Sequence, residues 1–98
     1  MIQVHITSNT IDMVGHAPRP EDDPPGQNLV CSAVSALTLT LIDGLKAIAE
    51  MQIESWEDAG DVRIHWDDPN DIGKALIDTW FIGIMRIQES YDNTITII

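Results

Sequence analysis

Two side chains of this sequence, Cys31 and His16, have the chemistry of a nucleophile and its base. A cysteine thiolate attacks carbonyl carbon, and an imidazole within reach can take the thiol proton, so the pair could perform nucleophilic catalysis. Fourteen residues separate them, so only the folded chain could bring them together. The alternative is a small packed cysteine and an unrelated histidine, and spacing alone does not decide between the two.

Cys31 is expected in the first turn of a helix. Asn28 is a suitable N-cap, and the helix would begin at Leu29. The unpaired N–H groups and the dipole of a helix N-terminus favour a thiolate over a thiol. Ser35 lies one turn further along the same flank, where its hydroxyl could touch the sulfur or a substrate group. The core-facing stripe of this helix is predicted from residues spaced by threes and fours: Val30, Val34, Leu37, Leu41, Leu45 and Ile48.

The segment before the helix would carry His16 toward it. Alternating apolar residues predict a strand over residues 1–6 and a second strand that ends at Gly15. Glycine beside His16 would permit a tight turn or a close approach of backbone. Residues 17–28 contain four of the five prolines and predict a mobile loop.

The remaining elements complete one domain over residues 1–98. A hairpin is expected over residues 50–66 with its turn at 57–61, and a final strand over residues 94–98. Between them, a second helix is expected to begin at Pro69, capped by Asp68, and to end near Ser90. The order ββαββαβ predicts an α+β fold with two helices packed on a mixed or antiparallel sheet.

Composition limits the partners. The formal net charge of −11 disfavours nucleic acid and anionic membranes, and it favours a basic partner or substrate, although acidity alone also keeps a protein soluble. One cysteine forms neither an internal disulfide nor a multi-thiolate metal site, and we expect no metal and no cofactor. No apolar run reaches the roughly 18 residues of a membrane span, and no signal peptide is evident, so a cytoplasmic location is expected.

Other candidate residues have two interpretations each. His5 and His65 lie in strand-like alternation and are expected to be surface or packing residues rather than ligands. The acidic cluster 21–23 could bind basic substrate residues or be a solvated loop tip. The three tryptophans are expected in the core or at a dimer interface: Trp56, Trp66 and Trp80.

The segments "GHA" at 15–17 and "NLVCSAVSAL" at 28–37, joined by a loop, resemble the ribosomal-processing cysteine protease (Prp) family, whose pattern is approximately GHA, a loop, then GEDIVCAAVS. The resemblance covers essentially the whole chain. It implies a bacterial, cytoplasmic, homodimeric endopeptidase that removes the N-terminal extension of a large-subunit ribosomal protein. It also implies that Cys31 is the nucleophile, that His16 is the general base, and that Gly15, Asn28 and Ser35 support the substrate or the site.

Two departures from the family pattern concern recognition. Asn28 stands where the pattern has an acid, and the loop over residues 17–28 is unusually rich in proline. A non-catalytic module of the same fold that binds a basic ribosomal or assembly partner is therefore the alternative function.

Overall fold

A computed structural model describes residues 1–15, 29–58 and 60–98 of the chain. The elements follow the expected ββαββαβ order: β1 (Ile2–Ile6), β2 (Thr10–Val14), α1 (Leu29–Ala47), β3 (Ile53–Asp58), β4 (Asp61–Trp66), α2 (Asp71–Ser90) and β5 (Ile95–Ile97). The predicted α+β class is confirmed, and the predicted loop over residues 17–28 lies outside the described residues.

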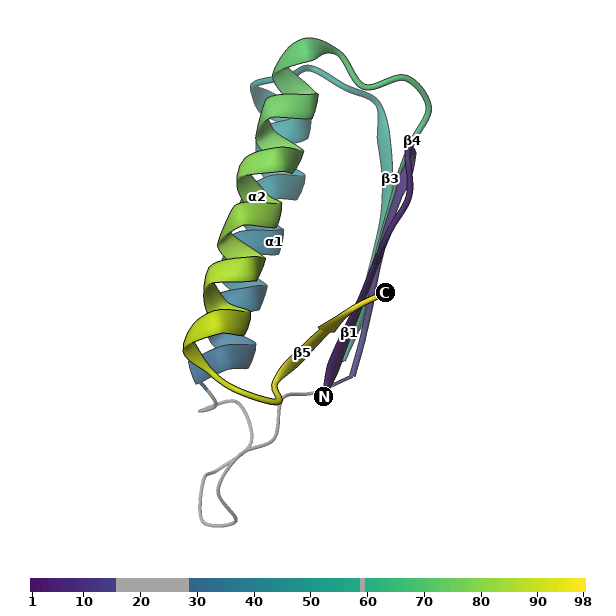
Figure 1. The fold of residues 1–98 in the computed structure, drawn as a ribbon. Coiled ribbons are helices and arrows are strands. Elements are labelled where there is room, and N and C mark those ends of the chain that lie inside the picture. Colours follow the sequence, from purple (N-terminus) through teal and green to yellow (C-terminus); the bar gives the residue numbers. More distant parts are fainter. Residues whose placement is uncertain (16–28, 59) are drawn as a thin grey trace.

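The strands form one mixed sheet in the order β3-β4-β2-β1-β5. Strand β5 pairs in parallel with β1, whereas the other three pairings are antiparallel. Both helices lie on one face of this sheet, side by side (Figure 1). Helix α1 contacts β3 and α2 contacts β5, so each helix covers one half of the face. Strand β3 is consequently an edge strand that lies beside α1.

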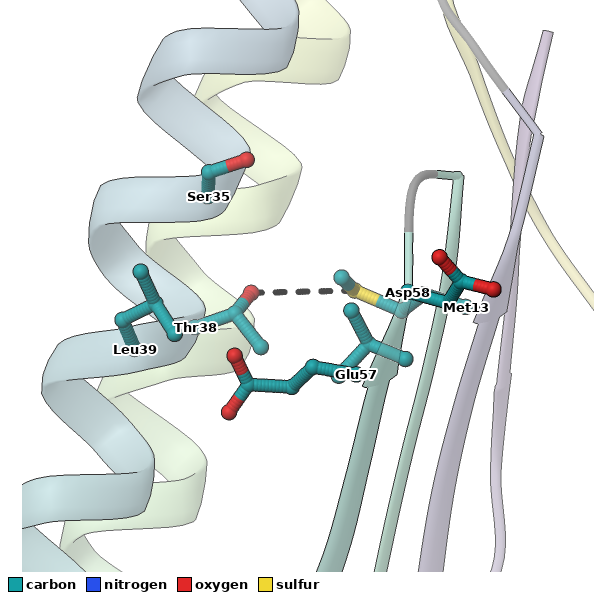
Figure 2. Close-up of a pocket in the computed structure, with 7 residues that line it drawn as sticks. Met13, Ser35, Thr38, Leu39, Glu57 and Asp58 are labelled. Carbon is teal, nitrogen blue, oxygen red and sulfur yellow. Dashed lines mark hydrogen bonds between the residues drawn. The ribbon is translucent and has the colours of Figure 1, made fainter.

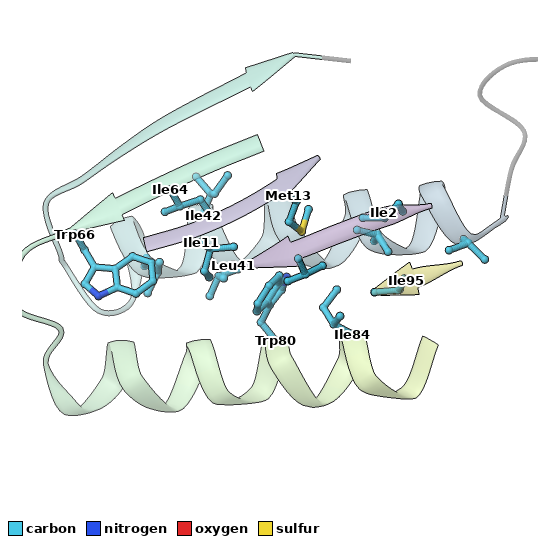
Figure 3. Packing of buried hydrophobic residues seen from close by; sticks show 14 residues of the cluster. Ile2, Ile11, Met13, Leu41, Ile42, Ile64, Trp66, Trp80, Ile84 and Ile95 are labelled. Atoms are coloured by element: carbon cyan, nitrogen blue, oxygen red, sulfur yellow. The ribbon is translucent and has the colours of Figure 1, made fainter. Parts of the chain in front are cut away.

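The hydrophobic core fills the space between the sheet and the two helices (Figure 3). Every strand except β3 contributes fully buried side chains, because alternate residues of a strand point to the same face. Trp66 and Trp80 are buried in this core, as the sequence predicts. Trp56 is different: it is 51% exposed on the face without helices, where the guanidinium of Arg63 lies 5.5 Å from its ring centroid.

Helix α1 packs on the sheet with a stripe that differs from the predicted one in its middle and at its end: Leu37 is only partly buried, whereas Thr38 and Ile42 are buried. Ile48 was expected in the stripe, but it is 63% exposed because the helix ends at Ala47. Contrary to the expectation from the sequence, α1 is long and apolar enough to cross a membrane by length and composition, because its leucine, valine, isoleucine and alanine residues outweigh the serines and threonines between them. The helix instead has the pattern of a core helix, with six buried residues: Val30, Val34, Thr38, Leu41, Ile42 and Leu45.

The buried threonine in this stripe joins the two helices. Thr38 Oγ1 donates to the Val34 carbonyl at 2.7 Å, and it accepts a hydrogen bond of 3.1 Å from the indole Nε1 of Trp80 in α2. Both polar groups are buried, so each satisfies the other where water cannot. This hydrogen bond links the two helices near the middle of each.

Two predicted boundaries are wrong. Helix α2 begins at Asp71, because the Asn70 side chain accepts from the Gly73 N–H at 2.8 Å and so takes the capping role expected of Asp68. Strand β3 extends to Asp58, so Glu57 and Asp58 belong to a strand rather than to the predicted turn. The turn is shorter than expected, and Gly60 supplies its left-handed backbone, with φ of 73°.

Replacing Thr38 by valine tests the hydrogen bond between the helices. Thr38→Val keeps the shape of the side chain but leaves the Trp80 N–H buried without a partner, so we expect the free energy of unfolding to fall by about 1–3 kcal/mol. Urea unfolding followed by circular dichroism measures this change.

Thr40→Val is the matched control. Thr40 makes the same type of bond to a carbonyl of its own helix, from Oγ1 to Ala36 O at 2.6 Å, but it is exposed. We expect its replacement to change stability by no more than about 0.5 kcal/mol. Equal losses from the two variants would contradict the role given to Thr38.

Candidate active site

Three segments lie at the same end of the molecule: the end of β2 and the tip of the β3–β4 hairpin in the sheet, and the first turn of α1 in the helix layer (Figure 1). Val14, the last residue of β2, pairs with Asp61, the first residue of β4. The next residue, Gly15, donates its N–H to the carbonyl of Gly60 at 2.8 Å. The end of β2 is therefore tied to the hairpin tip directly before position 16.

Only glycine fits at position 15. Its φ of 109° lies in a region that L side chains rarely adopt. A Cβ atom at this position would also overlap the carbonyl oxygen of Met1 on the neighbouring strand. The backbone therefore requires the glycine of "GHA", because only glycine lets the chain pass so close to β1 after the end of β2.

Cys31 is the third residue of α1 and lies in its first turn, as predicted. Its side chain is half-buried and packs against the core, and the rest of it is open to solvent. The first turn carries no acidic side chain, and Lys46 in the last turn complements the opposite end of the dipole. The thiol therefore lies in the positive field of the helix N-terminus.

A cavity of about 240 Å³ opens beside Ser35, one helical turn after Cys31. Ser35 itself is exposed on the flank that faces the hairpin. The other residues that line the cavity come from α1 and from three strands (Figure 2): Met13, Thr38, Leu39, Glu57, Asp58 and Val62.

Several predicted site residues lie outside the described part of the chain. They are His16, Asn28 and the acidic residues 21–23. Of the five site residues expected from the sequence, the structure thus describes Gly15, which follows the last residue of β2, and Cys31 and Ser35, which lie in the first two turns of α1. The distance between Cys31 and His16 stays untested.

Neither the cavity nor the position of Glu57 in its lining was predicted from the sequence. The acid was assigned to a turn because "EDAGD" has turn composition. The signal that could have found it is strand alternation, since Glu57 continues the period of Ile53 and Ser55 and therefore faces the helices.

The other candidates stay on the surface. His5 is exposed, and His65 lies on the outer face of the sheet, where its Nε2 is 3.5 Å from the side-chain nitrogen of Asn9. Among residues 1–15, 29–58 and 60–98, no three His, Cys, Asp or Glu side chains come together in a way that could hold a metal ion.

Comparisons with known proteins agree on one family. The family model described as cysteine protease Prp matches residues 1–96. The chain resembles the crystal structure of an essential ribosomal processing protease Prp from S. aureus with a covalently linked product peptide, at a TM-score of 0.82 and 19% identity over 98% of this chain and 94% of that one. It also resembles SMU.848 from Streptococcus mutans, at a TM-score of 0.78 and 22% identity over 99% and 95% of the two chains. A search of curated protein sequences found no significant match.

We expect Gly15→Ala to destabilise the protein. The substitution combines an unfavourable φ with overlap on the Met1 carbonyl, so the free energy of unfolding should fall by at least about 1 kcal/mol in urea titrations. Gly44→Ala is the control, because a Cβ there would meet only Leu76 Cδ1 at 3.5 Å. That helical substitution should leave stability unchanged or raise it by up to about 1 kcal/mol. A Gly15→Ala protein as stable as the wild type would contradict the constraint described here.

Proposed function

The chain belongs to the cysteine protease Prp family, and from this premise we propose that it removes the N-terminal extension of a large-subunit ribosomal protein during ribosome assembly. The observation that carries the proposal is the placement of the chain's one thiol. Cys31 is half-exposed in the first turn of α1, at the end of the molecule where Gly15 delivers the chain to residue 16. Relatives of the same fold are ribosomal processing proteases bound to a substrate or a product peptide, which supports a peptide substrate.

In this proposal Cys31 is the nucleophile and His16 is the general base. His16 takes the thiol proton, and the Sγ thiolate attacks the carbonyl carbon of the scissile peptide bond. The backbone N–H groups of the first turn of α1 have no partner within the helix, and they stabilise the negative charge that develops on the carbonyl oxygen. Gly15, Asn28 and Ser35 support the pair and the bound peptide.

The proton returns in the second half of the cycle. The imidazolium of His16 gives its proton to the leaving amine as the carbon–nitrogen bond breaks, and a thioester joins the substrate to Cys31. Water, deprotonated by the same imidazole, then attacks the thioester carbonyl. The second product leaves as a carboxylic acid, and the thiol is restored.

Charge supports this class of substrate. Ribosomal proteins that contact RNA phosphates are basic, and a chain with a formal net charge of −11 attracts them at long range. We further propose that the enzyme works in the cytoplasm as a homodimer, as its resemblance to the family implies.

Cleavage by a single-residue variant tests the proposal. Incubation with a large-subunit ribosomal protein that retains its N-terminal extension should yield a shortened product, detected by mass spectrometry. Cys31→Ala should lower the cleavage rate by at least about a thousandfold, because it removes the nucleophile.

Ser32→Ala is the control for this cleavage experiment. Ser32 is the exposed neighbour of Cys31, and the family pattern has alanine there, so the variant should cleave like the wild type. Cleavage by Cys31→Ala at the wild-type rate, or no cleavage by the wild type, would contradict the proposed function.

Alkylation separates a catalytic thiol from a packed one. At neutral pH, iodoacetamide should modify Cys31 faster in the folded protein than in urea, because only the folded chain places the sulfur at a helix N-terminus. Mass spectrometry at timed intervals gives both rates. A slower reaction in the folded protein would favour the alternative of a non-catalytic module that binds a basic partner.

A further inference from the structure

We propose that the cavity beside Ser35 binds an apolar side chain of an extended peptide, and that Glu57 selects a lysine or arginine next to that side chain. This inference rests on the proposed function, because it treats the cavity as a subsite of the same peptide-cleaving centre. It assigns substrate selection to strand β3, an element that contains neither predicted catalytic residue.

The cavity lies close enough to the Cys31 thiol to bind a substrate residue next to the scissile bond. Ser35 lines the cavity and is four residues after Cys31, which is roughly 6 Å along the helix axis. Successive residues of an extended substrate peptide advance by about 3.3 Å. A peptide whose scissile carbonyl lies at the Cys31 sulfur would therefore reach the cavity with a side chain one or two residues away.

The size and lining of the cavity fit one apolar side chain. Its volume of about 240 Å³ is smaller than the roughly 300–1,000 Å³ of sites for drug-sized ligands. Its lining is mostly apolar and includes Met13, Leu39 and Val62, and Figure 2 shows Leu39 on the helix opposite Glu57 of the hairpin. Burial of a leucine-sized side chain in such surroundings is favourable by about 1.5–3 kcal/mol.

Of the two acids that line the cavity, Glu57 and Asp58, strand register puts Glu57 on the face that carries the helices. Glu57 pairs with Val62, and Val62 pairs with Met13, so the three residues form a row on the face that carries the helices. The row begins in the core at Met13 and ends at the edge strand with Glu57. The carboxylate of Glu57 points toward α1 near Thr38 and Leu39 (Figure 2).

The charge of Glu57 is not neutralised within the described part of the chain. The nearest cation along the hairpin, Arg63, points to the opposite face of the sheet and pairs there with Asp61 at 3.4 Å. An acid beside an apolar cavity is therefore available to a cationic side chain of the bound peptide, in agreement with the overall net charge of −11.

The outer edge of β3 offers its backbone for pairing with an extended peptide. Among the described residues, β3 pairs only with β4, and its other edge faces outward next to α1. An extended peptide added to such an edge places alternate side chains in the adjacent groove. This arrangement fits an unfolded N-terminal extension better than a folded partner.

Equilibrium binding to the Cys31→Ala protein tests the inference without cleavage. The probes are fluorescein-labelled short peptides with a central leucine followed by lysine or by glutamine, and fluorescence anisotropy at low salt gives each Kd. We expect the lysine peptide to bind about three- to fivefold more tightly, and a peptide with serine in place of leucine to bind about tenfold more weakly.

The Glu57→Gln substitution should make the lysine and glutamine peptides bind equally. Glu54→Gln is the matched control: it removes the same charge from the same strand, but Glu54 pairs with His65 on the outer face, and the preference for lysine should persist. Equal Kd values in the parent protein, no measurable binding, or a preference that survives Glu57→Gln would overturn the inference. Selective binding combined with no cleavage of any ribosomal protein would instead overturn the proposed function and leave the subsite intact.

Discussion

The packing of α1 along the sheet is the constraint on which the rest of this molecule depends. The buried stripe of α1 contacts the sheet and α2, and this packing, together with the hydrogen bond from Trp80 Nε1 to Thr38 Oγ1, opposes sliding of one helix along the other. Sliding by one residue would move the first turn by about 1.5 Å and turn it by about 100°. Such a shift would move the Cys31 thiol out of its half-buried position against the core, so the core holds the position of the sulfur.

A second constraint comes from the hairpin. The pairing of β3 with β4 sets which residues of β3 face α1, because a slip of one residue would exchange the two faces. In the observed register Glu57 lies on the face that carries the helices and the cavity, whereas Glu54 and Trp56 lie on the outer face. The edge strand β3 thus places the Glu57 carboxylate beside the apolar cavity, on the side opposite α1.

The positive end of the α1 dipole and the negative charge of Glu57 lie at different positions along α1. The positive field of the helix N-terminus acts over the first turn, where Cys31 lies and where no acid is present. Glu57 faces the helix near Thr38, seven residues after Cys31, or roughly 10 Å further along the axis. Water and salt screen exposed charges over about this distance, so an acid that attracts a basic peptide leaves the positive field at the helix terminus largely unchanged.

The sequence by itself determined the order of elements, the start of α1 at Leu29 and the place of Cys31 in its first turn, because hydrophobic period, capping residues and chain position are local properties. It also determined the family, through "GHA" and "VCSAVS" at matching positions. Only the tertiary structure decided that Thr38 is buried while Ile48 and Trp56 are exposed, since burial depends on which neighbours arrive from distant parts of the chain. The same holds for Glu57: its turn-like neighbours concealed its role, and the pairing of β3 with β4 beside α1 put its carboxylate at the edge of a cavity.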